Sequence, residues 1–137
     1  MRLIAAVLLI AGNEFYCATS PTVVAFGFCP DNNVTVHVAP GYSPVFSWSP
    51  SCGISALTVF TESDVNALWT VYGNASANDN PIESGVRYGQ TPANGRTVAG
   101  PLQLERGVTY RVQVRRLICE RGSPCYVMAA GETRFQP

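Results

Sequence analysis

The sequence comprises 137 residues with a formal net charge of zero, of which 47% are hydrophobic and 13% charged. This length gives room for one domain of ordinary size, and the composition excludes the high-charge, low-hydrophobicity signature of intrinsic disorder. The balanced charge argues against a nucleic-acid-binding protein. The charges are nevertheless uneven, because Arg2 is the single cation of residues 1–83 and the other arginines follow.

The N-terminal segment MRLIAAVLLIAG has the layout of a secretory signal peptide, with one positive charge and then an apolar run from Leu3 to Ala11. The run is shorter than the ~20 apolar residues of a transmembrane helix, so we expect no transmembrane span. Small residues at 18–20 favour cleavage before Pro21. The alternative is a buried first strand. The predicted organisation is a signal peptide at 1–20, an N-terminal extension at 21–32 and one domain at 33–137.

The segment LLIAG also resembles the front of a bacterial lipobox. Asn13 stands where the lipid-accepting cysteine belongs, and Cys17 follows four residues later. A lipid anchor is therefore an alternative to a cleaved, soluble N-terminus.

Removal of the signal peptide leaves an even number of cysteines, namely Cys29, Cys52, Cys119 and Cys125. In an exported chain this number predicts two disulfides. The paired short spacings of a zinc site are missing, and so is the C-x-x-C motif of a redox site. We therefore predict disulfides and no metal.

From residue 22 onward the hydrophobic residues alternate in short runs, which turn-forming segments such as PDNN, PGYSP and SPSCG separate. Seven to nine short strands at this spacing predict an all-β fold, an antiparallel sandwich or barrel. The predicted strands are 22–28, 34–39, 44–49, 56–61, 67–73, 86–89, 98–104, 109–118 and 126–135.

The segment LERGVTYRVQV resembles the fibronectin type III pattern of a Leu, a turn with Gly and a Tyr, here Leu104, Gly107 and Tyr110. VFSWSP likewise resembles the second strand of that immunoglobulin-like sandwich, with Trp48 as a core aromatic. Arg106 replaces the usual Pro of the family. The resemblance implies a tyrosine corner at Tyr110, in which the hydroxyl contacts upstream backbone.

The resemblance also implies strand roles, with 34–39 as A, 44–49 as B, 56–61 as C, 67–73 as C′, 98–104 as E, 109–118 as F and 126–135 as G. CERGSPC then becomes the loop of the F–G hairpin, which favours a Cys119–Cys125 disulfide. The antiparallel A and B strands favour Cys29–Cys52. The other two pairings stay open, because all four cysteines would lie at one pole.

Catalytic residues are hard to assemble from this sequence. His37 lies in VTVHVA, where alternation directs it to solvent, and no G-x-S-x-G, P-loop or H-E-x-x-H motif occurs. Trp48 shares a face with Phe46, and Trp69 shares one with Val71, which favours core packing over sugar stacking. We expect no enzyme and no cofactor, with an unrecognised hydrolase as the least favoured alternative.

The basic second half of the chain supplies the binding candidates. Alternation places Arg111 and Arg115 on one face of strand 109–118, and guanidinium groups hold sulfate, phosphate or carboxylate. The alternative is a solvated face that prevents aggregation. The polar region 73–97 adds further contact candidates. The candidate binding residues are Arg87, Tyr88, Arg111, Arg115, Arg121 and Arg134.

These features predict an exported module, secreted, periplasmic or at the cell surface, that binds an unidentified protein or glycan of the cell envelope without catalysis. A purely structural spacer is one alternative. A binder of anionic glycans through the Arg-bearing sheet face is another.

Overall fold

The computed structural model describes residues 29–63, 65–74 and 80–137. The predicted signal peptide, Cys17 and the predicted strand 22–28 lie outside these residues. Within them the chain forms strands and no helix, so the search for an apolar helix of membrane-spanning length finds none there. The strands are β1 (Thr35–Ala39), β2 (Val45–Ser49), β3 (Ala56–Thr61), β4 (Ala67–Gly73), β5 (Val86–Arg87), β6 (Gly95–Ala99), β7 (Tyr110–Ile118) and β8 (Tyr126–Phe135).

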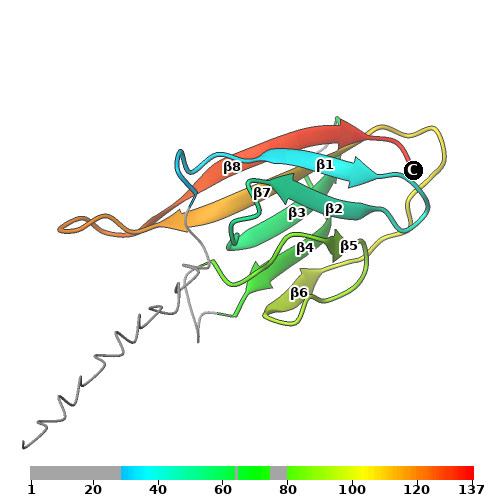
Figure 1. Cartoon of the computed structure of the whole chain (residues 1–137). Coiled ribbons are helices and arrows are strands. Elements are labelled where there is room, and N and C mark those ends of the chain that lie inside the picture. Colours follow the sequence, from blue (N-terminus) through cyan, green and yellow to red (C-terminus); the bar gives the residue numbers. More distant parts are fainter. Residues whose placement is uncertain (1–28, 64, 75–79) are drawn as a thin grey trace, which may run out of the picture.

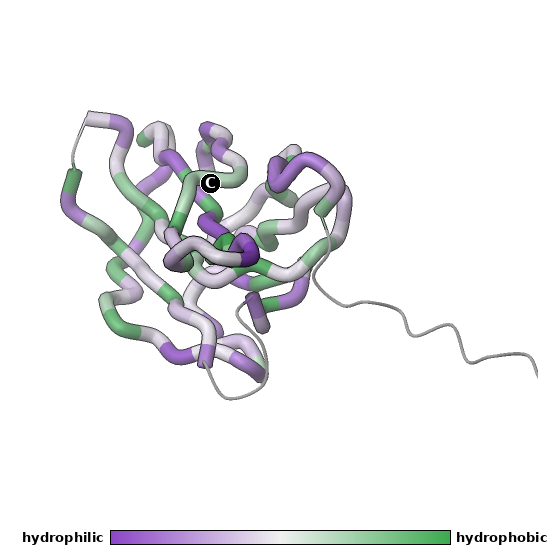
Figure 2. Tube along the Cα trace, turned by 90° about the vertical axis from the view of Figure 1, so that its left-hand side faces the viewer, coloured by the Kyte–Doolittle hydropathy of each residue, from purple (hydrophilic) through white to green (hydrophobic). Residues whose placement is uncertain are grey.

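The strands form two antiparallel sheets that lie face to face (Figure 1). One has three strands in the order β1-β2-β5, and the other has five in the order β6-β4-β3-β7-β8. This arrangement confirms the predicted all-β antiparallel sandwich. Hydrophobic and hydrophilic segments alternate along the chain (Figure 2), as expected for strands with one face on a core and one on solvent.

The core lies between the sheets and is built around Phe46 of β2, which is fully buried. Its ring lies 5.3 Å from that of Phe135 and 6.4 Å from that of Trp69, measured between centroids. Trp48 is also buried, and its indole N–H donates to the Cys52 carbonyl at 2.6 Å. Core packing of Trp48 and Trp69 is therefore confirmed. Buried residues alternate with more exposed ones in β2 and β7, which is the pattern that period 2 predicts, whereas residues 56–59 of the central strand β3 are all buried.

The prediction for strand 98–104 is wrong in its bounds and its partner. The observed β6 ends at Ala99, because Gly100 has a φ of +67° and Pro101 has no N–H to donate. β6 pairs with β4 in the five-stranded sheet, whereas the E-strand role requires the smaller sheet. β5 occupies that third position beside β2. The predicted strand 86–89 is also shorter, since Gly89 has a φ of +80°.

The two sheets approach each other most closely where β1 lies alongside β8 (Figure 1). The Val34 N–H donates to the Ala130 carbonyl at 2.8 Å. Ala130 is an extra residue in β8, because Val114 pairs with Gly131 while Arg115 pairs with Ala129. A Cβ on Gly131 would collide with the Val34 carbonyl, so glycine at this position permits the contact between the sheets.

Tyr110 makes the upstream contact that the resemblance implied. Its side chain is 2% exposed, and its hydroxyl accepts a hydrogen bond from the Glu105 N–H at 2.8 Å. Leu104 is buried beside this turn, and Gly107 has a φ of +78°. The connection from β6 to β7, two strands of the five-stranded sheet, is therefore anchored at the start of β7.

Both favoured disulfides are present. Cys29 bonds to Cys52 with Cα atoms 5.6 Å apart, and Cys119 bonds to Cys125 with Cα atoms 4.2 Å apart. The first bond lies in the core, whereas the second closes the exposed turn between β7 and β8. Two disulfides are typical of a protein that folds in an oxidising, extracytoplasmic environment.

Candidate functional site

The outer face of the five-stranded sheet carries three of the candidate arginines. Arg111 and Arg134 are direct neighbours across β7 and β8. The Arg111 guanidinium lies 3.4 Å from the Glu132 carboxylate, and Arg134 lies 2.6 Å from Glu62. Glu132 on β8 and Glu62 in the turn after β3 thus balance both of these charges, which leaves less positive potential for an anionic ligand than the sequence indicated.

Arg115 is the third arginine of this face, and it is held by an aromatic ring. Its guanidinium carbon lies 5.7 Å from the centroid of Tyr72, and its Nη2 donates to the Tyr72 hydroxyl at 3.3 Å. Among the described residues its Nε is buried without an acceptor. Arg115 belongs to neither of the ion pairs at Arg111 and Arg134, so their carboxylates do not balance its positive charge.

The structure does not bring the remaining two arginines to this face. Arg121 lies in the exposed turn of the β7–β8 hairpin. Arg87 lies on β5 in the other sheet, where its Nη1 donates to the Ser43 carbonyl at 3.3 Å. The six candidate residues consequently do not form one continuous site.

Tyr88 lies in the core, 7% exposed. Its ring packs edge-on against Trp69 with centroids 5.1 Å apart, and its hydroxyl donates to the Leu102 carbonyl at 2.6 Å. Burial, with a smaller contribution from nearby Tyr110, raises the pKa of Tyr88 to about 12. Tyr88 therefore packs in the core and does not present its ring at the surface.

We expect this buried phenol to make the protein lose stability at alkaline pH. Tyr88 ionises near pH 10 in the unfolded chain and near 12 in the folded one. The folded state thus holds the proton more tightly, and stability falls as the pH rises through this window. The loss is about 1.4 kcal/mol for each pKa unit. Denaturant unfolding at several pH values should show a shallower fall in Tyr88→Phe but not in the exposed control Tyr126→Phe; equal slopes would contradict the assignment.

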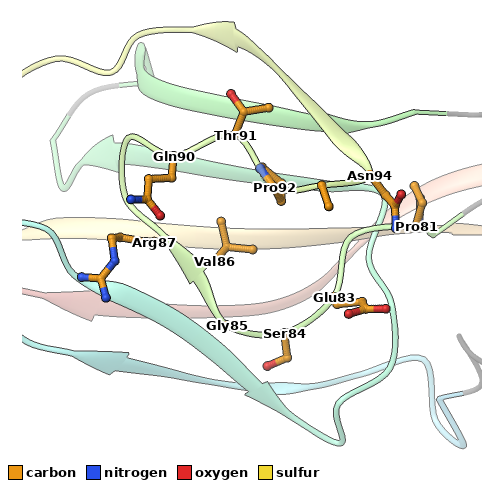
Figure 3. Close-up of a pocket in the computed structure, with 11 residues that line it drawn as sticks. Pro81, Glu83, Ser84, Gly85, Val86, Arg87, Gln90, Thr91, Pro92 and Asn94 are labelled. Carbon is orange, nitrogen blue, oxygen red and sulfur yellow. The ribbon is translucent and has the colours of Figure 1, made fainter.

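A polar crevice of about 250 Å³ lies between the segment that leads into β5 and the loop that leads into β6 (Figure 3). Glu83 and Asn94 lie on one side of it, and Arg87 and Gln90 on the other. The side chains of Glu83, Gln90 and Asn94 have no hydrogen-bond or ion-pair partner among the described residues. These groups can donate to and accept from a polar ligand. All residues that line this crevice belong to the polar region 73–97, which the sequence indicated as a source of contact residues.

The β7–β8 hairpin extends beyond the body of the sandwich (Figure 1). All residues from Cys119 to Val127 are exposed, including Tyr126 at 47% and Val127 at 54%. The Cys119–Cys125 disulfide closes the turn. The hairpin is thus an exposed, disulfide-closed element, and Tyr126 and Val127 lie outside the core.

Sequence reasoning missed two residues of functional or structural weight. Tyr72, 39% exposed, holds Arg115 on the outer face. Arg116 is 4% exposed and points inward, where its Nε donates to the Gly53 carbonyl at 2.9 Å. The alternation of Tyr110, Val112 and Val114 continues to Arg116, so extending that pattern by one step would have placed it inside.

His37 is exposed on β1, as the alternation predicted. Across 29–63, 65–74 and 80–137, no cluster of three or more His, Cys, Asp or Glu side chains could hold a metal ion. Comparisons with protein-family models, curated proteins and solved structures find no match to this chain.

Proposed function

We propose that the chain is an exported, non-catalytic binding module with a fibronectin type III-like or immunoglobulin-like fold. It recognises a protein partner in the cell envelope or outside the cell. The signal-peptide pattern of residues 1–20 and the two disulfides support export. The contact of Tyr110 with Glu105 supports the fold assignment, although β6 beside β4 is an addition to the strand set that the resemblance implied.

The observation that carries the proposal is the exposed β7–β8 hairpin, which the Cys119–Cys125 disulfide closes. An exposed hairpin can contact a partner with both of its faces, and Tyr126 and Val127, which are consecutive on β8, place one exposed apolar side chain on each face. A disulfide at the turn limits the conformational freedom that binding would remove, which favours affinity. Arg121 adds a cation at the tip, and Tyr and Arg are enriched among residues that dominate binding energy.

The test compares three proteins in a quantitative pull-down from envelope extract: the wild type, Tyr126→Ser/Val127→Ser, and the control Leu102→Ser. Leu102 is 59% exposed and lies outside the hairpin. We expect the double variant to retain at most about a tenth of the specific recovery, since two interface anchors contribute roughly 1–2 kcal/mol each. The control should bind as the wild type does.

Thermal unfolding of all three proteins provides the check on folding, because the substituted side chains are exposed. Specific proteins recovered equally by the wild type and the double variant would exclude the hairpin as the recognition surface. Recovery of no specific protein under any condition would favour a structural spacer.

A further inference from the structure

A second surface feature lies on the outer face of the five-stranded sheet, where the β7–β8 hairpin leaves the body. It is a mainly apolar hollow of about 290 Å³. Nothing in the sequence indicated it, because its walls come from five separate segments of the chain. The lining residues are Ser55, Ala56, Tyr72, Gly73, Pro81, Arg115, Leu117 and Val127.

The hollow follows from the cross-strand register. Ala56 of β3 pairs with Tyr72 of β4 on one side and with Arg115 of β7 on the other. A methyl group therefore lies between two long side chains, and Ala56 is only 2% exposed beneath them. Leu117 and Val127, a directly paired couple on β7 and β8, form the apolar wall toward the hairpin.

The charge of the hollow comes from Arg115. Its guanidinium lies over the Tyr72 ring at 5.7 Å, and the 3.3 Å contact with the Tyr72 hydroxyl is long for a strong hydrogen bond. Arg111 and Arg134 on the same face have carboxylate partners, whereas neither reported ion pair includes Arg115. The buried Nε of Arg115 lacks an acceptor within the described part of the chain, as does that of Arg111, so the missing carboxylate partner is what distinguishes Arg115. A guanidinium in this state binds carboxylates well, because both are planar and their hydrogen bonds are charge-assisted.

We propose that this hollow binds a small amphipathic carboxylate, meaning an apolar ring or short chain joined to one carboxylate group. The apolar part lies between Tyr72 and the Leu117–Val127 wall, and the carboxylate lies at the guanidinium of Arg115. A dry cavity of about 150 Å³ holds a benzene ring, so the hollow has room for one ring with a short acid side chain. Polyhydroxylated anions suit it less, since their hydroxyls would lose water against apolar carbons. The hollow shares Val127 with the exposed hairpin, but the ligand and its recognition by Arg115 do not depend on the proposed protein partner.

The test is a titration of the oxidised protein with phenylacetate, followed by two-dimensional NMR of backbone amides, methyl groups and arginine side chains. The neutral isostere phenylacetamide and the small anion acetate are the matched ligands. We expect saturable shifts at Tyr72, Val127 and the Arg115 side chain with phenylacetate. Phenylacetamide and acetate should each bind at least fivefold more weakly, because phenylacetamide lacks the negative charge and acetate lacks the apolar ring.

The matched protein variants are Arg115→Gln and Arg111→Gln, which lie on the same strand and the same face. Arg115→Gln should weaken phenylacetate binding at least fivefold, whereas Arg111→Gln, whose charge Glu132 already balances, should change it less than twofold. Equal affinities of phenylacetate and phenylacetamide, equal effects of the two variants, or shifts located elsewhere would overturn the proposal. Chemical shifts away from the hollow report whether each variant keeps its fold.

Discussion

Replacing Cys29 and Cys52 together with Ala is expected to lower the free energy of unfolding by about 3–5 kcal/mol. The bond closes a loop across a sequence separation of 23 residues, and its removal restores conformational freedom to the unfolded chain. Both residues are also core residues, 2% and 6% exposed, so their loss removes packing beside Trp48. Guanidinium denaturation gives the free energy directly.

The matched control is Cys119→Ala/Cys125→Ala. Its disulfide spans a separation of only 6 residues and lies in an exposed turn, so we expect a loss of about 2 kcal/mol or less. Trp48 donates to the Cys52 carbonyl, and the near-ultraviolet circular dichroism of the first variant should therefore change more than that of the control. Equal losses in the two variants would show that burial of the first bond adds nothing to its effect.

Truncation of the buried arginine, Arg116→Ala, is expected to lower the free energy of unfolding by about 2–3 kcal/mol. The guanidinium donates to the Gly53 carbonyl and to the Asn32 side chain, both at 2.9 Å. Burial lowers the pKa of Arg116, which reflects the removal of its charge from water. Truncation leaves these acceptors without their donor and opens a cavity at the inner face of β7.

The neighbouring substitution Arg115→Ala is the control, because Arg115 is only partly buried on the opposite face of the same strand. We expect its effect to stay within about 1 kcal/mol. Arg116→Lys should fall between the two, since an ammonium group keeps the charge but lacks the forked donors. A loss in Arg116→Ala no larger than that in Arg115→Ala would contradict the structural role of Arg116.

The Cys29–Cys52 disulfide and the hydrogen bonds of Arg116 hold the same two segments of the chain together. Asn32 and Gly53 lie close in sequence to Cys29 and Cys52, so Arg116 links the same two segments that the disulfide joins. Contacting groups of this kind are not additive. The triple variant should therefore lose a different amount of stability from the sum of the separate losses, measured by the same denaturation experiment.

The strands and their inward faces could be predicted because alternation is local. Phe46 and Trp48 share a face, as do Tyr110 and Val112, because side chains two residues apart on a strand point to the same side of the sheet. The Cys119–Cys125 pair followed from a hairpin with only a few residues in its turn. The upstream contact of Tyr110 lies within five residues of it. Each of these features depends on residues that are near one another in the chain.

The arrangement of the strands required the tertiary structure. The alternation of hydrophobic residues along a strand does not depend on which strand lies beside it. It therefore could not show that β6 pairs with β4 or that β5 completes the smaller sheet. For that reason the predicted arginine surface was dispersed, with Arg87 on the other sheet and carboxylates beside Arg111 and Arg134. The hollow at Arg115 likewise depends on strand pairing, which brings Ala56, Tyr72 and Arg115 together from three strands. The sequence by itself determined which residues face inward, whereas pairing between distant strands decided which side chains meet, because such contacts depend on the packing of the whole sandwich.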